Sequence, residues 1–297
     1  MKKGLAAPKW SLPGTIRSFE RKPPAVPLIF AFLIVLLLSW WLGAPWLAEQ
    51  RRGRIGRRPF PNAWRRILRR RVPYLRRLPA DLQLQLQRRI QIFIAEKPFI
   101  GCGGLEVTDE MRVTVAAQAC LLLLNGPAGG FRNLRQILLY PNAFIVNRVA
   151  TASGGVLRDE RQVLAGESWS QGQVVLSWED VQAGAAVPDD GRNVVVHEFA
   201  HQLDQENGPA NGAPSLSAGQ QGKRWSAVLA EAFTRLRALA RDGEASLLSH
   251  YGATDPAEFF AVASEVFFEQ PGELAAQYPA LYAELSAFYR VNPLSWH

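Results

Sequence analysis

Two histidines and a glutamate fall within five residues, at His197-Glu198-Phe199-Ala200-His201. In a helix, residues four apart lie on the same face, so both imidazoles could bind one metal ion. Glu198 lies one position further round the helix and could take a proton from a water molecule at that metal. This pattern is typical of zinc-dependent peptidases. We therefore predict that His197 and His201 bind one Zn²⁺ per chain and that Glu198 is the general base.

The residues around this motif favour a helix. Asp190 or Asn193 can cap the N-terminus, residues 194–196 are three valines that can be buried, and Gly208 can end the helix. The whole chain has only four histidines, and two of them lie in the motif. The alternative is a pair of ordinary surface histidines on a helix, without a metal.

A zinc site that keeps one position open needs a third protein ligand. No further histidine follows the motif at a short spacing, so we expect a carboxylate from a later helix. The candidates are Glu231, Glu258, Glu265, Glu269 and Glu273.

Local sequence favours Glu258 among these candidates. Pro256 predicts the start of a helix with Asp255 as its cap, which places Glu258 in the first turn. Phe259 and the apolar residues that follow predict that this turn is buried. Burying a carboxylate there costs folding free energy unless the carboxylate is paired or bound to metal. Glu265 lies two turns along the same face and is the competing ligand, or else a residue that orients a ligand.

Strand patterns occur early in the chain and helical patterns late, which predicts an α+β domain. We expect helices at 80–96 and 109–124, two strands within 136–147 broken at Pro141-Asn142, a strand at 173–178, and helices at 224–241, 256–269 and 273–290.

An uncharged apolar segment of 21 residues, from Leu28 to Ala48, precedes this domain. As a helix it would be about 30 Å long, which matches the hydrocarbon thickness of a bilayer. It is too long for the apolar part of a signal peptide and too apolar on all sides for a typical core helix. We therefore predict a single uncleaved transmembrane helix, which divides the chain into a basic tail (1–27), the span (28–48), an arginine-rich juxtamembrane segment (49–77) and the zinc metallopeptidase domain (78–297).

Charge predicts which way the span is oriented. Six Lys and Arg precede it and ten follow by residue 71, and the more basic side usually stays in the cytoplasm. We therefore expect a single-pass protein of the bacterial inner membrane with a cytoplasmic catalytic domain, and contacts between residues 28–77 and membrane lipid.

The two parts of the chain differ in net charge. Residues 1–77 carry 18 basic and two acidic side chains, whereas residues 78–297 carry 16 basic and 24 acidic ones. An acidic body argues against nucleic acid as a partner. The two cysteines are too few for a disulfide scaffold and fit a reducing compartment.

Four segments carry a resemblance to a known family. They read HEFAHQLD, YPNAF, GESWSQG with QVVLSWEDV, and YGATDPAEFFAVASEVFF. The chain, from about Phe60 to the C-terminus, resembles the Mlc titration factor A family of zinc peptidases and, more distantly, the catalytic domain of anthrax lethal factor. The membrane span and its arginine flank are not part of the usual soluble family pattern.

The resemblance implies a gluzincin, in which two histidines and a glutamate from a later helix bind zinc. The matching positions are His197, His201 and Glu258, with Glu198 as the catalytic base. Tyr251 matches a tyrosine seven residues before the ligand glutamate and is expected to stabilise the oxyanion. The implied function is hydrolysis of a peptide or protein substrate, with aminopeptidase action as one form. The family also implies an alternative, in which the protein mainly sequesters a transcriptional repressor.

Overall fold

The structure is a computed structural model that describes residues 25–126, 130–152, 156–164, 166–169, 172–216 and 219–296. Most of the predicted basic tail therefore lies outside the described residues. Residues 1–48 and 49–297 form two compact units, and each is treated by itself.

The longer helices are α1 (Ala25–Gly56), α2 (Asn62–Arg71), α3 (Ala80–Glu96), α4 (Asp109–Leu121), α5 (Trp178–Ala186), α6 (Val194–Asp204), α7 (Gly222–Asp242), α8 (Pro256–Glu269), α9 (Pro271–Gln277) and α10 (Pro279–Tyr289). Short 3₁₀ helices include η1 (Pro73–Arg77) and η3 (His250–Ala253). The strands are β1 (Phe99–Gly101), β2 (Gln136–Tyr140), β3 (Phe144–Ala152), β4 (Val156–Leu164), β5 (Gly166–Trp169) and β6 (Gln173–Ser177).

The predicted transmembrane segment lies within α1. Among the side chains of this segment that the structure describes, the large apolar ones are exposed, for example Leu37 at 68% and Trp40 at 73%. Among the described residues, this is the one helix that is long and apolar enough to cross a membrane.

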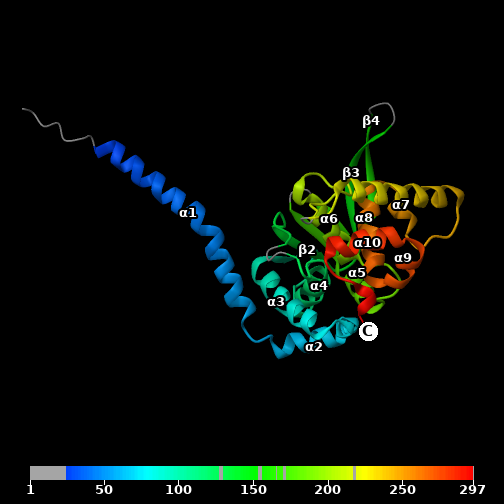
Figure 1. The fold of residues 1–297 in the computed structure, drawn as a ribbon, viewed down its shortest axis with the longest axis horizontal. Coiled ribbons are helices and arrows are strands. Elements are labelled where there is room, and N and C mark those ends of the chain that lie inside the picture. Colours follow the sequence, from blue (N-terminus) through cyan, green and yellow to red (C-terminus); the bar gives the residue numbers. More distant parts are fainter. Residues whose placement is uncertain are drawn as a thin grey trace, which may run out of the picture. The chain divides into compact units, whose positions relative to one another are not determined.

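The second unit is built on a four-stranded sheet in the order β1-β2-β6-β5. Its first three strands run parallel, and β5 pairs antiparallel with β6 at the edge, with Gly166 opposite Leu176. Ile137 and Leu139 alternate inward on β2 and are fully buried, as period-two patterning requires. Strands β3 and β4 form a separate antiparallel hairpin, which projects from the body of the unit (Figure 1).

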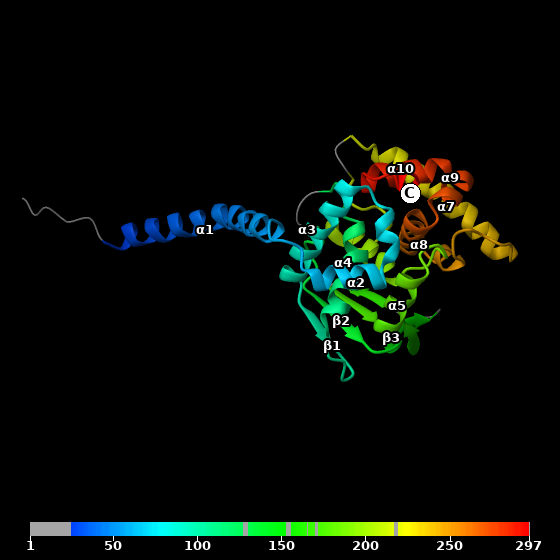
Figure 2. The same ribbon diagram turned by 90° about the horizontal axis from the view of Figure 1, so that it is seen from below.

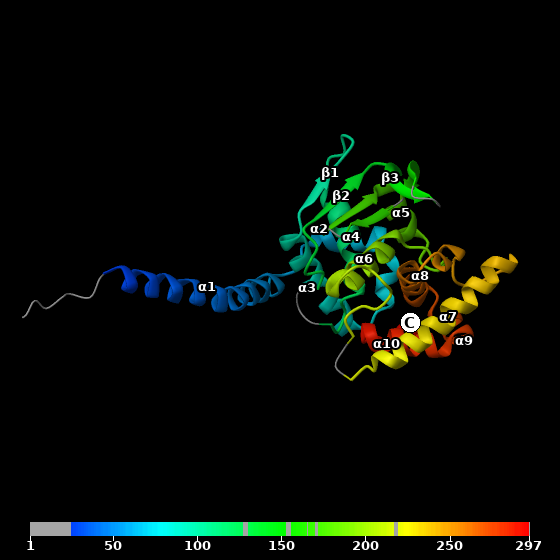
Figure 3. The same cartoon turned by 90° about the horizontal axis from the view of Figure 1, so that it is seen from above.

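Helices α4, α6 and α8 lie on the same side of the sheet (Figures 2 and 3). Helix α6 packs against α8, α4, α5 and the edge strand β5, so it connects the sheet to the C-terminal helices. The core also includes Phe60, Val72 and Leu75 from the arginine-rich segment. Part of residues 49–77 therefore packs as one body with the domain that follows.

The mixed, helix-rich architecture with a small sheet confirms the predicted α+β class. Most predicted elements occur within a few residues of their expected bounds. The single helix predicted at 273–290 is wrong, because the chain forms α9 and α10 there. Pro279 begins α10, and the residue before a proline avoids helical geometry, as Tyr278 does with φ −137° and ψ 61°.

Candidate metal centre

Helix α6 presents the two histidines of the motif. Asn193 caps it by accepting a hydrogen bond from the Val196 N–H at 3.0 Å, one of the two caps that the sequence allows. The opposite face of α6 is fixed by Phe199, which is fully buried and packs edge-on against Phe131 with ring centroids 4.8 Å apart. The cap and this aromatic contact fix both the start and the rotation of the helix.

Helix α8 brings Glu258 to the same place. The Asp255 carboxylate accepts hydrogen bonds from the backbone N–H groups of Ala257 and Glu258 at 2.9 and 3.0 Å, which confirms the predicted cap. Phe259 and Phe260 are buried in the core. Glu258 therefore points out of a rigid first turn, with its side chain only 19% exposed.

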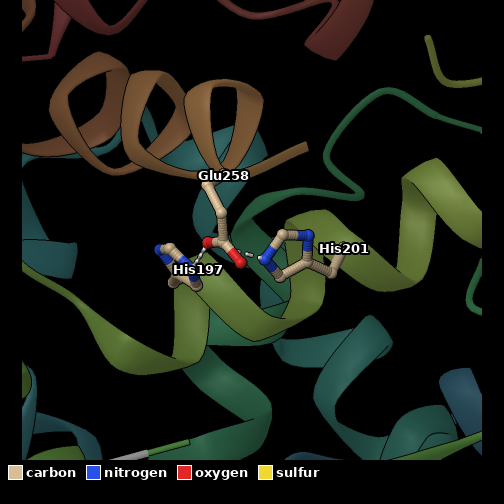
Figure 4. A group of neighbouring side chains, drawn as sticks. All are labelled: His197, His201 and Glu258. Atoms are coloured by element: carbon tan, nitrogen blue, oxygen red, sulfur yellow. Dashed lines mark hydrogen bonds and ion pairs between the residues drawn. The ribbon is translucent and has the colours of Figure 1, made fainter. Parts of the chain in front are cut away.

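The three predicted ligand side chains meet between α6 and α8. One oxygen of Glu258, Oε2, lies 3.0 Å from His197 Nε2 and 3.3 Å from His201 Nε2. Figure 4 shows the carboxylate reaching down from α8 between the two imidazoles. One donor atom from each residue lies within 4.8 Å of the others.

The chemistry of this donor group fits a divalent metal. Two imidazole nitrogens and one carboxylate oxygen are ligands that zinc accepts, and three protein ligands leave one position open. Among the residues that the structure describes, this is the group of acidic, histidine or cysteine side chains placed to hold an ion. Of the five candidate glutamates, only Glu258 belongs to it.

Glu265 contacts the Nδ1 side of His197, whereas Glu258 contacts its Nε2 side. Its Oε1 lies 2.7 Å from His197 Nδ1, and its Oε2 accepts a hydrogen bond from the Asn193 N–H at 2.5 Å. A carboxylate at Nδ1 keeps the proton on that nitrogen and leaves Nε2 free to bind a metal. Glu265 therefore fits the role of the residue that orients a ligand.

A buried polar network continues from Glu265 into the core. Asn193 donates from Nδ2 to Gln118 Oε1 at 2.8 Å and to Glu269 Oε1 at 2.9 Å. The Arg192 N–H donates to Glu269 Oε2 at 3.0 Å. This network fixes the start of α6 against α4 and α8, and it connects residues too far apart in sequence for their spacing to reveal it.

The charges of the donor group are strongly coupled. Burial lowers the pKa of His197, but the nearby Glu258 and Glu265 carboxylates outweigh it, and the net pKa lies well above the usual value. Burial raises the pKa of Glu258, but hydrogen bonds from His197 and His201 dominate and hold it far below the usual range. A cation, whether a proton or a metal, is thus strongly favoured between these side chains.

Glu198 is 6% exposed and lies beside the donor group on the same helix. Burial raises its pKa to about 7, although His197 and His201 oppose that shift. Gly166 on the edge strand lies against it, since a Cβ on Gly166 would come within 2.8 Å of Glu198 Oε1 and within 2.7 Å of Val194. The close approach of β5 to α6 therefore requires a glycine, and neither spacing nor composition indicated this.

Tyr251 lies on η3 at the rim of the site. Its ring centroid is 5.9 Å from that of His197, and the side chain is 48% exposed. A cavity of about 430 Å³, lined by the predicted ligands, Glu198 and Tyr251, lies on one side of the histidine pair. A second cavity of about 700 Å³ shares His197, Glu198 and Tyr251 with the first.

Asp204, three residues after His201 at the end of α6, is fully buried. Its Oδ2 accepts hydrogen bonds from the N–H groups of Asn211 and Gly212 at 2.8 and 2.7 Å. It thereby holds the loop that carries Asn211 into the wall of the smaller cavity.

The donor group fits a metallopeptidase, and comparison with known proteins agrees. The chain belongs to the glucose-regulated metallopeptidase M90 family, whose model matches residues 46–290. It is similar to an uncharacterized protein of Synechocystis sp., with 37% identity over 90% of this chain and 97% of that protein. It is also similar to Mlc titration factor A of Klebsiella pneumoniae, with 34% identity over 84% of this chain and 92% of the relative. The predicted family resemblance is thus confirmed.

Proposed function

We propose that the protein is a membrane-anchored zinc peptidase of the gluzincin type. The observation that carries the proposal is the meeting of His197 and His201 from α6 with Glu258 from α8, one donor atom of each within 4.8 Å of the others. Family membership supports peptide hydrolysis and a divalent metal. The histidine and carboxylate donors favour zinc among such metals.

These three residues would hold the zinc ion. When bound, zinc would polarise the scissile carbonyl and lower the pKa of a water molecule. Glu198 accepts a proton from the attacking water and later donates it to the leaving amine nitrogen. Tyr251, at the rim of both cavities, donates a hydrogen bond to the oxyanion of the substrate. Glu265 keeps the His197 ring in its orientation.

The proton-transfer role is tested with Glu198→Gln in the full-length chain, purified in detergent. Because Glu198 is not among the ligands, the variant should keep its zinc and lose turnover of a chromogenic amino-acid amide or a peptide by about 10²-fold or more. Zinc content is measured by atomic absorption on the same sample. Full activity of the variant would show that Glu198 is not the base.

The anchor is a separate part of the proposal. We propose that residues 28–48 cross the inner membrane once, that the catalytic domain faces the cytoplasm, and that residues 28–77 contact lipid. The exposed apolar surface of α1 and the excess of arginine after it support this. We propose that the metallopeptidase domain spans residues 78–297 and that its core also includes Phe60, Val72 and Leu75 from the preceding segment. A reporter fused after the last residue should be active in the cytoplasm, and periplasmic activity would refute the orientation.

The name of several relatives supports a second function. Because they are called Mlc titration factor A, we propose binding of a transcriptional repressor as the alternative. The Glu198→Gln variant separates the two functions, since repressor binding would survive the loss of turnover. If wild type neither binds zinc nor cleaves any peptide but retains a repressor in a pull-down, the binding function replaces the peptidase function.

A further inference from the structure

A third cavity of the catalytic unit shares no lining residue with the two cavities at the metal centre. It has a volume of about 560 Å³, is open to solvent, and is lined mainly by residues of α2, η1 and α3. We call it the arginine cavity; its lining residues are Arg65, Leu68, Arg69, Val72, Leu75, Arg76, Gln83, Leu86 and Gln87. Its size is in the range of small-ligand sites.

Three arginines line this cavity without a salt-bridge partner in the described part of the chain. Arg65 and Arg69 are four residues apart on one face of α2, and Arg76 joins them from η1. No ion pair joins any of these three to an acid among the described residues, whereas the neighbouring Arg70 and Arg71 both pair with Glu110. Like charges at this helical spacing repel each other, so an anion in the cavity would relieve the repulsion.

The rest of the lining is an apolar wall, formed by Leu68, Val72, Leu75 and Leu86, together with two glutamines, Gln83 and Gln87. Val72, Leu75 and Leu86 belong to the hydrophobic core. Gln83 Nε2 donates to the backbone carbonyls of Leu78 at 2.8 Å and Arg76 at 3.2 Å, which ties η1 to α3. The exposed arginines therefore lie beside an apolar wall that the core residues and the Gln83 hydrogen bonds hold in place.

We propose that the arginine cavity binds the phosphate headgroup of an anionic phospholipid. Guanidinium groups recognise phosphate through paired charge-assisted hydrogen bonds, and the apolar wall matches the glycerol and first acyl carbons of a lipid. Free phosphate and nucleic acid would leave that wall unused. Arg65 follows the apolar segment by only 17 residues, which keeps the cavity within reach of a membrane surface. The inference rests on the proposed membrane anchor.

The test is native mass spectrometry of the full-length chain released from detergent micelles that contain phosphatidylglycerol and phosphatidylcholine in equal amounts. Wild type should retain one phosphatidylglycerol. The triple variant Arg65→Gln, Arg69→Gln and Arg76→Gln should bind it at least about tenfold more weakly, which corresponds to the loss of one charge-assisted hydrogen bond. A matched control, Arg132→Gln, Arg135→Gln and Arg237→Gln, removes equal charge from exposed arginines outside both the cavity and the segment 28–77 and should bind like wild type.

Equal loss of lipid in both triple variants would overturn the proposal, because binding would then follow overall charge. Displacement of the lipid by an equimolar single-stranded oligonucleotide, or by inorganic phosphate alone, would also overturn it in favour of those ligands. Zinc content and peptide hydrolysis, measured on the same samples, keep a failure of the cavity distinct from a failure of the peptidase. Extraction of cell membranes at alkaline pH tests the anchor separately.

Discussion

Replacing Glu269 with glutamine should change how the stability of the catalytic unit depends on pH. Glu269 is 8% exposed, and burial together with the nearby Asp190 and Glu265 raises its pKa to about 8 from 4.5, even though Asn193 and the Arg192 N–H donate to it. Burial, together with the charge of Glu269, in turn raises the pKa of Tyr74. The folded protein therefore keeps this carboxyl protonated across a range in which the unfolded chain releases the proton.

The number of bound protons determines whether the free energy of unfolding rises or falls with pH. Between about pH 4.5 and pH 8 the folded state holds more protons than the unfolded state, so this group lowers the free energy of unfolding as pH rises. At 1.36 kcal/mol per pKa unit, the shift corresponds to a loss on the order of 5 kcal/mol by pH 8. Glutamine removes that loss but has one acceptor, so the hydrogen bond from the Arg192 N–H, worth about 1 kcal/mol, is lost.

The variant Glu269→Gln should therefore be slightly less stable than wild type at pH 5 and clearly more stable at pH 8.5. Denaturant unfolding of the full-length chain in detergent, followed by tryptophan fluorescence at both pH values and at equal zinc load, measures the difference. Glu273→Gln, a change at an exposed acid on the next helix, is the matched control. Parallel pH dependence of wild type and Glu269→Gln would refute the reasoning.

Two further variants test the architecture of the site. Gly166→Ala should keep its zinc and lose about 10²-fold in turnover, because the new Cβ displaces Glu198 or the edge strand. The control is Gly222→Ala, where a Cβ meets nothing within 4 Å. A Gly166→Ala enzyme with the turnover of wild type would show that the strand adapts freely. Tyr251→Phe should also keep its zinc and slow turnover by about 10²-fold with a smaller change in KM; turnover equal to wild type would remove Tyr251 from the mechanism.

The local features of the site could be predicted from the sequence. The caps at Asn193 and Asp255 and the burial of Phe259 depend on neighbours within a few residues, so propensity and spacing were enough to identify α6 and the start of α8. The same local reasoning failed at Pro279, where apolar periodicity continued across a helix break.

Long-range features could not be predicted in this way. The contacts of Glu265 with His197 and Asn193 span about 70 residues, and spacing alone left Glu265 and Glu258 as competing ligands. Position 166 requires a glycine only because β5 lies against α6, and the sequence did not predict β5. The packing of the arginine-rich segment into the core was hidden because its charge dominates its composition, while its apolar residues are few and widely spaced.

The zinc content of three purified full-length proteins tests the central claim most directly. Wild type should bind one zinc ion per chain, and Glu258→Ala should lose most of its affinity because a ligand is gone. Glu265→Ala should weaken binding by about 10–100-fold, the usual effect of removing a residue that orients a ligand. A Glu258→Ala protein with full zinc beside a zinc-free Glu265→Ala protein would contradict the assignment of the metal centre.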